Sequence, residues 1–265
     1  MNDNDRVEVS IVLPCYNGED TLMKCLESIN NQCYKIELVF VNDGSTDNSL
    51  KIFNKFKFDK NISIKLIDRE NKGFLYSLNE AIGKSTGNFI ARIDADDFWD
   101  ENHIITILKK FNQNSDYVLI GSQCIIINDN DEVLGESNLP INHKKIVKWL
   151  HKDNPFIHSS VVFKKEVYLK TTGYYSSDSD FFKHIADYNL WFEFSKFGLC
   201  ENINEKTVYY RFAENSMSRS INMVNNLKSR LYVMRNVNAY YKSYKTYYYY
   251  HKLKVSLKAL IYKLF

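Results

Sequence analysis

Short apolar runs alternate with segments of helical apolar spacing through the first hundred residues of this chain. The runs are rich in β-branched side chains, as buried strands are, and the segments between them repeat their apolar positions every three to four residues. The predicted strands are 7–14, 36–42, 62–68 and 88–94, and the predicted helices between them are 20–31, 45–58 and 73–85. This alternation predicts an α/β domain with a parallel sheet, right-handed crossovers and helices on both faces.

The pattern becomes mixed after Phe111, and no internal repeat or Pro/Gly-rich linker separates the two parts. We expect strands at 117–129 and 202–212, a hairpin turn at 128–135, helices at 143–152 and 186–198, and a strand followed by a helix within 158–175.

A polar cluster follows each of the first four predicted strands: "PCYNGED", "NDGSTD", "DRENKG" and "DADD". The carboxyl ends of parallel strands meet at one edge of a sheet, and ligands of open α/β sheets bind there. The four clusters therefore predict a binding site at that edge. No G-x-G-x-x-G follows the first strand, which excludes a dinucleotide dehydrogenase.

The acidic cluster after the fourth strand indicates a divalent cation. Asp94 and Asp96 stand one residue apart at the strand end, and carboxylate oxygens are ligands that Mg²⁺ and Mn²⁺ prefer. An EF-hand loop counted from Asp94 would need Gly and Glu where Trp99 and Ile105 stand, so that reading fails. The alternative is an acidic N-terminus for a helix beginning near Glu101, where the helix dipole favours negative charge.

Composition is ordinary for a globular protein of 265 residues, but the charge is unevenly placed. The net charge of +3 divides into +10 from Asn215 to the end, where there is no Asp or Glu, and −7 before it. The five cysteines include no C-x-x-C pair and no zinc-finger spacing, so we expect reduced thiols. The first residues lack a signal peptide, and no apolar run is long enough to cross a bilayer.

Residues 8–101 resemble the family 2 glycosyltransferases, which have the GT-A fold. The resemblance rests on "VSIVLPCYNGEDTLMKCLESINNQCY", "ELVFVNDGSTDNSL" and "ENKGFLYSLNEAIGKSTGNFIARIDADDFW", which match the family pattern in order and spacing. It implies a GT-A domain at 1–218, with a nucleotide-sugar-binding half at 1–100 and an acceptor-binding half at 101–218, followed by a basic aromatic helical tail at 219–265.

The resemblance also implies roles in donor binding. Asp43 would accept the N3–H of uracil, Asp94 would contact ribose or sugar, and Asp96, with Asp94, would hold the Mn²⁺ or Mg²⁺ that bridges the diphosphate. A cation is required there because an acidic edge repels a diphosphate. Lys72 would contact the diphosphate, with a solvated surface lysine as the alternative. The remaining residues implied to border the donor are Pro14, Tyr16, Asn17, Glu19 and Ala95.

The segment "IADYNLWFEFSKFG" resembles the part of the family that carries the catalytic base, with Ala186 where the family has Glu. Asp187 would take the proton from the acceptor hydroxyl as it attacks the anomeric carbon, which inverts configuration. A helix cap is the alternative role for Asp187. Asp178 and Asp180 are the fallback candidates for the base.

Two further positions follow from the resemblance. His158, in "NPFIHSSVVF", would face the acceptor, with a core histidine as the alternative. Ala213, in "VYYRFAENSMS", stands where the family usually has a His that can contact the metal or diphosphate. Either metal binding is weaker here, or Arg211 or a tail residue takes that role.

The tail predicts a lysine-rich amphipathic helix, with Leu253, Leu257 and Leu260 on one face. Such a helix suits an anionic membrane surface, and many members of the resembled family act on lipid-linked acceptors. Packing on the domain and nucleic-acid binding are the alternatives, and we expect no nucleic-acid partner.

The sequence therefore predicts an inverting transferase that moves a sugar, from a donor that we expect to be UDP-linked, to a hydroxyl of a surface glycan or glycolipid. We expect it in the cytoplasm, at the inner face of the membrane. A sugar nucleotidyltransferase should carry a Gly-rich basic loop after the first strand, which "PCYNGEDTL" is not. A non-catalytic nucleotide-sugar-binding scaffold is the other alternative, suggested by Ala186 and Ala213.

Overall fold

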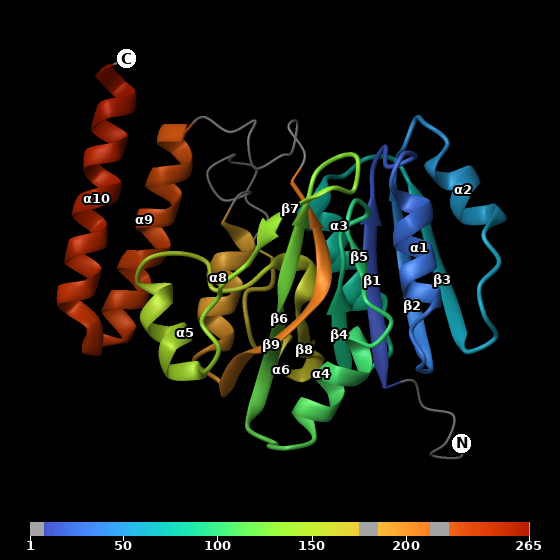
Figure 1. Ribbon diagram of the computed structural model, residues 1–265, viewed down its shortest axis with the longest axis horizontal. Coiled ribbons are helices and arrows are strands. Elements are labelled where there is room, and N and C mark those ends of the chain that lie inside the picture. Colours follow the sequence, from blue (N-terminus) through green and yellow to red (C-terminus); the bar gives the residue numbers. More distant parts are fainter. Residues whose placement is uncertain (1–7, 175–184, 213–222, 265) are drawn as a thin grey trace.

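The protein is a mixed α/β structure built on one twisted sheet (Figure 1). The computed structural model describes residues 8–174, 185–212 and 223–264. The strands are β1 (Val9–Cys15), β2 (Ile36–Asp43), β3 (Ile62–Arg69), β4 (Phe89–Arg92), β5 (Phe98–Trp99), β6 (Tyr117–Ile127), β7 (Val133–Glu136), β8 (Val162–Lys164) and β9 (Leu199–Arg211). The helices are α1 (Leu22–Asn30), α2 (Ser49–Lys55), α3 (Phe74–Lys84), α4 (His103–Phe111), α5 (His143–Leu150), α6 (Lys165–Tyr168), α8 (Ala186–Phe194), α9 (Met223–Tyr240) and α10 (Lys245–Leu264), with short 3-10 turns η2 (His158–Ser160) and η3 (Lys242–Tyr244).

The sheet has a parallel half and a mixed half. Its strand order is β3-β2-β1-β4-β8-β6-β9-β5, with β7 paired to β6. Strands β3, β2, β1 and β4 are parallel, as the sequence predicts, and β8 then runs antiparallel to both β4 and β6. The predicted hairpin is present as β6 and β7. The carboxyl ends of the parallel strands therefore share one edge.

Each face of the parallel half is covered by helices. In β1, Ile11 and Leu13 point to a core formed with α1, α2 and α4, while Val12 points to a second core formed with α3, α5, α8 and α9. This two-sided burial explains why β1 and β2 read as largely apolar runs, whereas β3, at the edge of the sheet, alternates apolar and polar residues.

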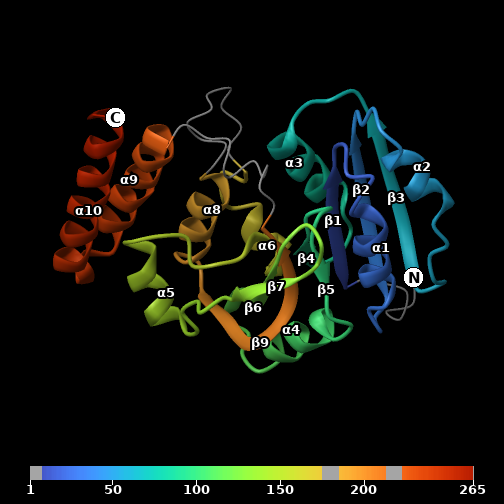
Figure 2. The ribbon, with the colours of Figure 1, turned by 45° about the horizontal axis from the view of Figure 1, so that its top comes forward.

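The basic tail forms two helices, α9 and α10, where the sequence predicts one amphipathic helix. They lie side by side at the end of the molecule opposite β3 (Figures 1 and 2). Val233, Met234 and Val237 of α9 are fully buried in the core shared with α8. The division of the chain at residue 218 stays a prediction, but α9 packs on the body as a core helix. Among the described helices, none has the length and apolarity to cross a bilayer.

Replacing Met234 with alanine should lower the free energy of unfolding by about 2–5 kcal/mol, because its buried side chain would leave a cavity under α9. Urea denaturation followed by circular dichroism measures the change. The control is Arg235→Ala on the exposed side of α9, which should stay within about 0.5 kcal/mol of the unaltered chain. Equal stability of the two variants would mean that α9 does not pack on the body in solution.

Candidate active site

The loops after β1 and β2 are joined to each other by polar contacts. Asn17 adopts a left-handed backbone conformation (φ 52°), and its side-chain oxygen accepts a hydrogen bond from the Thr46 amide at 2.8 Å. The Asn17 amide in turn donates to Ser45 Oγ at 3.1 Å. Because Ser45 and Thr46 are used in this way, α2 begins at Ser49 rather than at the predicted residue 45.

Glu19 makes a second junction between these loops. Its carboxylate accepts hydrogen bonds from the Asn48 amide at 2.9 Å and from Asn48 Nδ2 at 2.7 Å. Of the residues expected to border a nucleoside, Asn17 and Glu19 therefore shape the edge, Pro14 is buried in β1, and Tyr16 is 54% exposed. Among these residues, Tyr16 is the one with an exposed aromatic ring on which a ligand could stack.

Asp43 ties the end of β2 to the loop after β3. Its carboxylate accepts from the backbone amides of Lys72 (2.8 Å) and Gly73 (3.0 Å) and from the Arg69 guanidinium. Gly44 lies at φ 72°, and a Cβ there would meet the Asn71 nitrogen at 2.6 Å, so this tie requires glycine. The Lys72 side chain is exposed, with Nζ 5.0 Å from the Tyr76 ring centroid.

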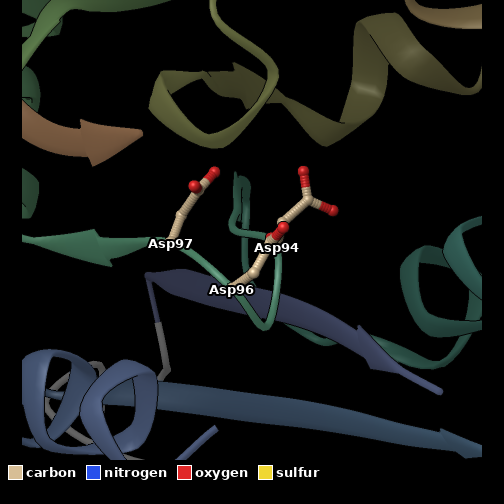
Figure 3. A group of neighbouring side chains, drawn as sticks. All are labelled: Asp94, Asp96 and Asp97. Carbon is tan, nitrogen blue, oxygen red and sulfur yellow. The ribbon is translucent and has the colours of Figure 1, made fainter. Parts of the chain in front are cut away.

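The acidic turn after β4 brings three carboxylates together (Figure 3). One oxygen from each of Asp94, Asp96 and Asp97 lies within 4.8 Å of the others. The Asp97 amide donates to the Asp94 carbonyl at 3.2 Å, and the Ala95 carbonyl accepts from Thr21 Oγ1 at 2.9 Å. Ala95 therefore fixes the turn to α1 through its backbone.

The three carboxylates of the acidic turn differ in their partners. Both oxygens of Asp94 accept from the guanidinium of Arg92, which is fully buried. Asp97 is buried, and it accepts from the Arg211 amide at 2.7 Å and from the Ser159 hydroxyl. Within the described ranges, the Asp96 carboxylate accepts no hydrogen bond from another residue, so it is the acid of the turn left for a ligand.

The electrostatics of the turn favour a cation. Burial raises the pKa of Asp96 to about 6, and the negative charge of Asp94 adds to the shift. Burial and the neighbouring acids also raise the pKa of Asp97. A positive charge beside such a group stabilises its ionised form. The donor set is oxygen only, which fits Mg²⁺ or Mn²⁺ held first through Asp96, while Asp94 is already paired with Arg92.

Arg211 makes three hydrogen bonds through its guanidinium group. Its Nε donates to the Asp96 carbonyl at 3.0 Å, Nη1 to the Asn128 carbonyl at 2.6 Å, and Nη2 to Asp131 at 2.5 Å. These bonds link the turn to the loop between β6 and β7. These contacts do not favour the expected role of Arg211 in place of a metal-contacting His. Ala213 lies outside the described residues.

Asp187 lies in the first turn of α8 and is not its cap, because the cap position is Ile185. Its carboxylate accepts from Asn154 Nδ2 at 2.7 Å and from the Tyr188 amide at 2.7 Å. Burial raises the pKa of Asp187 to about 6; Arg92 opposes this shift and Asp94 adds to it. Asp187 and the acidic turn thus lie in the field of one buried arginine.

His158 sits in an aromatic cluster rather than at an open surface. Its Nε2 lies 2.8 Å from Tyr174 Oη, and its ring meets Phe74 and Trp191 edge-on. Burial and the nearby Arg92 hold the pKa of His158 well below its usual range, so the ring is neutral. These contacts favour the core-histidine alternative. The fallback bases Asp178 and Asp180 lie outside the described residues.

Sequence reasoning missed three residues that organise the site: Arg92, Asn154 and Ser159. The sequence did contain a sign of the role of Arg92, because it is a charged residue within an apolar strand that leads directly into a run of acids. Asn154 and Ser159 lie in the motif that also contains His158, but nothing in their spacing distinguishes them from loop residues.

The family model described as "Glycosyl transferase family 2" matches residues 10–171, more than half of the chain. The chain belongs to glycosyl transferase family 2. It is 29% identical over 242 residues to an uncharacterized glycosyltransferase of Haemophilus influenzae, covering 88% of this chain and 74% of that protein. It is 28% identical over 218 residues to the O-antigen biosynthesis glycosyltransferase WbnJ of Escherichia coli, covering 80% and 82%. As a member of this family, the protein is a transferase.

Solved structures share the fold of this family 2 chain. The 1–349 fragment of S. aureus TarS in complex with UDP-GlcNAc has a TM-score of 0.61 at 17% identity, and the match covers 88% of this chain and 66% of that chain. The mannosyltransferase PcManGT from Pyrobaculum calidifontis, in complex with GDP-Man and Mn²⁺, has a TM-score of 0.59 at 15% identity, covering 96% and 87%. The GT-A fold expected from the sequence is confirmed.

Replacing Arg92 with methionine should destabilise the protein by about 3–5 kcal/mol, because the acidic turn would keep its carboxylates without their buried partner. Chemical denaturation measures the loss. The double variant Arg92→Met/Asp94→Leu removes both charges of the pair and should recover a large part of that loss. If the double variant were less stable than Arg92→Met alone, the ion pair would not be what holds the turn.

Proposed function

We propose that this family 2 glycosyltransferase moves a sugar from a UDP-sugar to a hydroxyl of a glycan or glycolipid with inversion at the anomeric carbon. The observation that carries the proposal is that two carboxylates in different environments, Asp96 and Asp187, both lie in the field of the buried Arg92. Asp96 is unpaired on the acidic turn, and Asp187 is half-buried in the first turn of α8 with a raised pKa. One suits a cation and diphosphate, and the other suits proton transfer.

On the donor side, Asp96 would hold a Mn²⁺ or Mg²⁺ ion, which supplies positive charge to the diphosphate when bound. Asp94, oriented by Arg92, would contact the ribose or the sugar. Asp43 would accept a hydrogen bond from the uracil N3–H through a lone pair that its present hydrogen bonds leave free. Lys72 would reach the diphosphate from an exposed position. The UDP-GlcNAc complex of TarS supports a UDP-linked donor. The residues proposed to border the donor are Pro14, Tyr16, Asn17, Glu19 and Ala95.

On the acceptor side, the Asp187 carboxylate would take the hydroxyl proton. The acceptor oxygen then forms a bond to the anomeric carbon while the bond from that carbon to the diphosphate oxygen breaks. Attack comes from the face opposite the leaving nucleoside diphosphate, so configuration inverts. Asn154 would orient Asp187 through its bond to the carboxylate. His158 would take part in acceptor binding only through the aromatic cluster that it shares with Tyr174.

For the acceptor, we propose a surface polysaccharide or lipooligosaccharide, with the protein in the cytoplasm at the inner face of a membrane. Support comes from relatives named for such polymers: WbnJ, and the chondroitin synthase of Pasteurella multocida, which is 23% identical over 231 residues covering 86% of this chain and 23% of that protein.

The direct test is release of free nucleotide from a panel of UDP- and GDP-sugars with and without Mn²⁺. We expect Mn²⁺-dependent UDP release from at least one UDP-sugar. Binding without release would favour the scaffold alternative. Pyrophosphate formation from a sugar phosphate and a nucleoside triphosphate would favour the nucleotidyltransferase alternative.

Replacing Asp187 with asparagine should lower turnover by about 10²–10⁴-fold while donor affinity stays unchanged, because proton transfer is lost and the side-chain shape is kept. Steady-state kinetics and calorimetric UDP binding measure the two effects. Glu193→Gln, the same change of charge later in α8, is the matched control and should keep normal turnover. Near-normal turnover of Asp187→Asn would remove Asp187 from the mechanism.

The pH dependence follows from the raised pKa of Asp187. The base must be ionised, so kcat/KM should fall as pH drops through about 6 and should lose about tenfold for each further pH unit. A pH–rate profile measures this limb. A profile that stays flat down to the ordinary range of an aspartate would contradict the assignment.

Replacing Asp96 with asparagine should weaken Mn²⁺ binding in the presence of UDP by roughly tenfold or more, because it removes the unpaired carboxylate of the turn. Isothermal titration calorimetry measures the affinity. Asp100→Asn removes the same charge four residues away, outside the three-carboxylate cluster, and should bind Mn²⁺ normally. Equal loss in both variants would mean that general charge, rather than ligation by Asp96, sets the affinity.

A further inference from the structure

An apolar stripe runs along the outer face of α10. We call it the α10 stripe; it consists of Tyr249 (58% exposed), Tyr250 (54%), Leu253 (60%), Leu257 (51%) and Leu260 (56%). Tyr249 and Tyr250 are adjacent, and the three leucines follow at spacings of three or four residues, so all five lie on one side of the helix. Contiguous exposed apolar surface of this kind marks an interaction site more often than scattered single side chains do.

The inner face of α10 is fixed to the body, so the stripe points away from it. Tyr248 is 4% exposed and belongs to the core shared with α8 and α9, and Val255 packs against that core. The turn before α10 is held as well: Tyr241 Oη donates to the Ser195 carbonyl at 2.6 Å, and the Tyr241 carbonyl lies 3.0 Å from His151 Nε2. The stripe is therefore presented by a docked helix.

Exposed lysines flank the stripe on both sides. Helical spacing places Lys245 and Lys252 along one border and Lys254 and Lys258 along the other, and all four are exposed. Lys254 Nζ lies 4.5 Å from the Tyr250 ring centroid, at the border itself. No Asp or Glu occurs from Asn215 to the end of the sequence, so nothing in the tail neutralises these charges.

We infer that the α10 stripe docks flat on an anionic lipid surface, with its leucines below the headgroups and its tyrosines and lysines at headgroup level. Leucines buried at the boundary, aromatic rings at the interface and lysines on both borders together match a helix lying in the plane of a membrane. A second copy of this chain fits less well, because stripe-to-stripe packing would bring two lysine-bordered helices together without any acidic partner in the tail.

This inference deepens the proposed location at a membrane and is independent of the donor chemistry. The stripe lies on α10, whereas the acidic turn follows β4, so variants of the stripe leave the proposed site untouched. UDP release from UDP-sugars without lipid reports on the site, and vesicle flotation reports on the stripe. Either proposal can fail without the other.

The experiment is flotation of the full chain with vesicles of POPC alone and of POPC containing about 30 mol% POPG. We expect flotation with the anionic vesicles, little with POPC alone, and release as salt rises from about 0.1 M to about 0.5 M. Absence of flotation with anionic vesicles would overturn the inference. Deleting the chain from Tyr240 is a poorer test, because it also removes the buried Tyr248.

Point substitutions separate the apolar and the charged contributions. Leu253→Gln/Leu257→Gln/Leu260→Gln should weaken partitioning by roughly tenfold or more, and Lys254→Gln/Lys258→Gln should weaken it by roughly 10–30-fold on anionic vesicles. The matched control is Val133→Gln/Leu134→Gln/Leu169→Gln, which alters aliphatic side chains 64%, 56% and 69% exposed elsewhere and should float normally.

Two further readouts keep the result unambiguous. Thermal melting should be unchanged in the stripe variants because their side chains are exposed, so loss of flotation is not loss of fold. Light scattering without lipid should show a monomer. A dimer that the triple leucine variant dissociates would assign the stripe to a second copy and overturn the lipid inference, as would equal flotation of the leucine variant and the unaltered chain.

Discussion

The buried ion pair between Arg92 and Asp94 is the interaction on which the candidate site depends. A guanidinium with no exposure is costly to desolvate, and here it is offset by two hydrogen bonds to one carboxylate and one to Ser159 at 3.2 Å. Because the pair ends β4, it fixes where the acidic turn leaves the sheet. The three neighbouring acids therefore differ in their contacts. Asp94 is paired with Arg92, Asp97 accepts hydrogen bonds from Ser159 and the Arg211 amide, and Asp96 is left available for a ligand.

The bounds of the parallel strands could be predicted closely from sequence, because β1 and β2 are buried along their whole length and read as largely apolar runs, while the edge strand β3 alternates apolar and polar residues. Helix starts were harder. The predicted helix at 45 begins at Ser49, because Ser45 and Thr46 bind the neighbouring loop instead of starting a helix. Local propensity cannot reveal that competition, since the partner residue Asn17 is far away in sequence.

The same limit applies to the site. Asp94, Asp96 and Asp187 were found by residue type and by resemblance, but their separate environments come from contacts made across the fold. Arg211 shows this most clearly: its sequence context suggested a free cation near the diphosphate, whereas three N–H groups of its guanidinium bind the turn and the β6–β7 loop. The same holds for the tail: amphipathic spacing predicted the helix α10, but it could not predict that α9 is buried against the body.

The hydrogen bonds of Ser159 limit which groups of the acidic turn can hold a ligand. Its hydroxyl accepts from the Asp94 amide and from Arg92 and lies against the carboxylates of both Asp94 and Asp97. One hydroxyl offers a single proton and two lone pairs, so its bonding capacity is saturated. Ser159 therefore has no lone pair left for an ion or a water. A ligand of the turn must find its oxygen partners elsewhere, and Asp96 is the carboxylate of the cluster to which no other described residue donates a hydrogen bond.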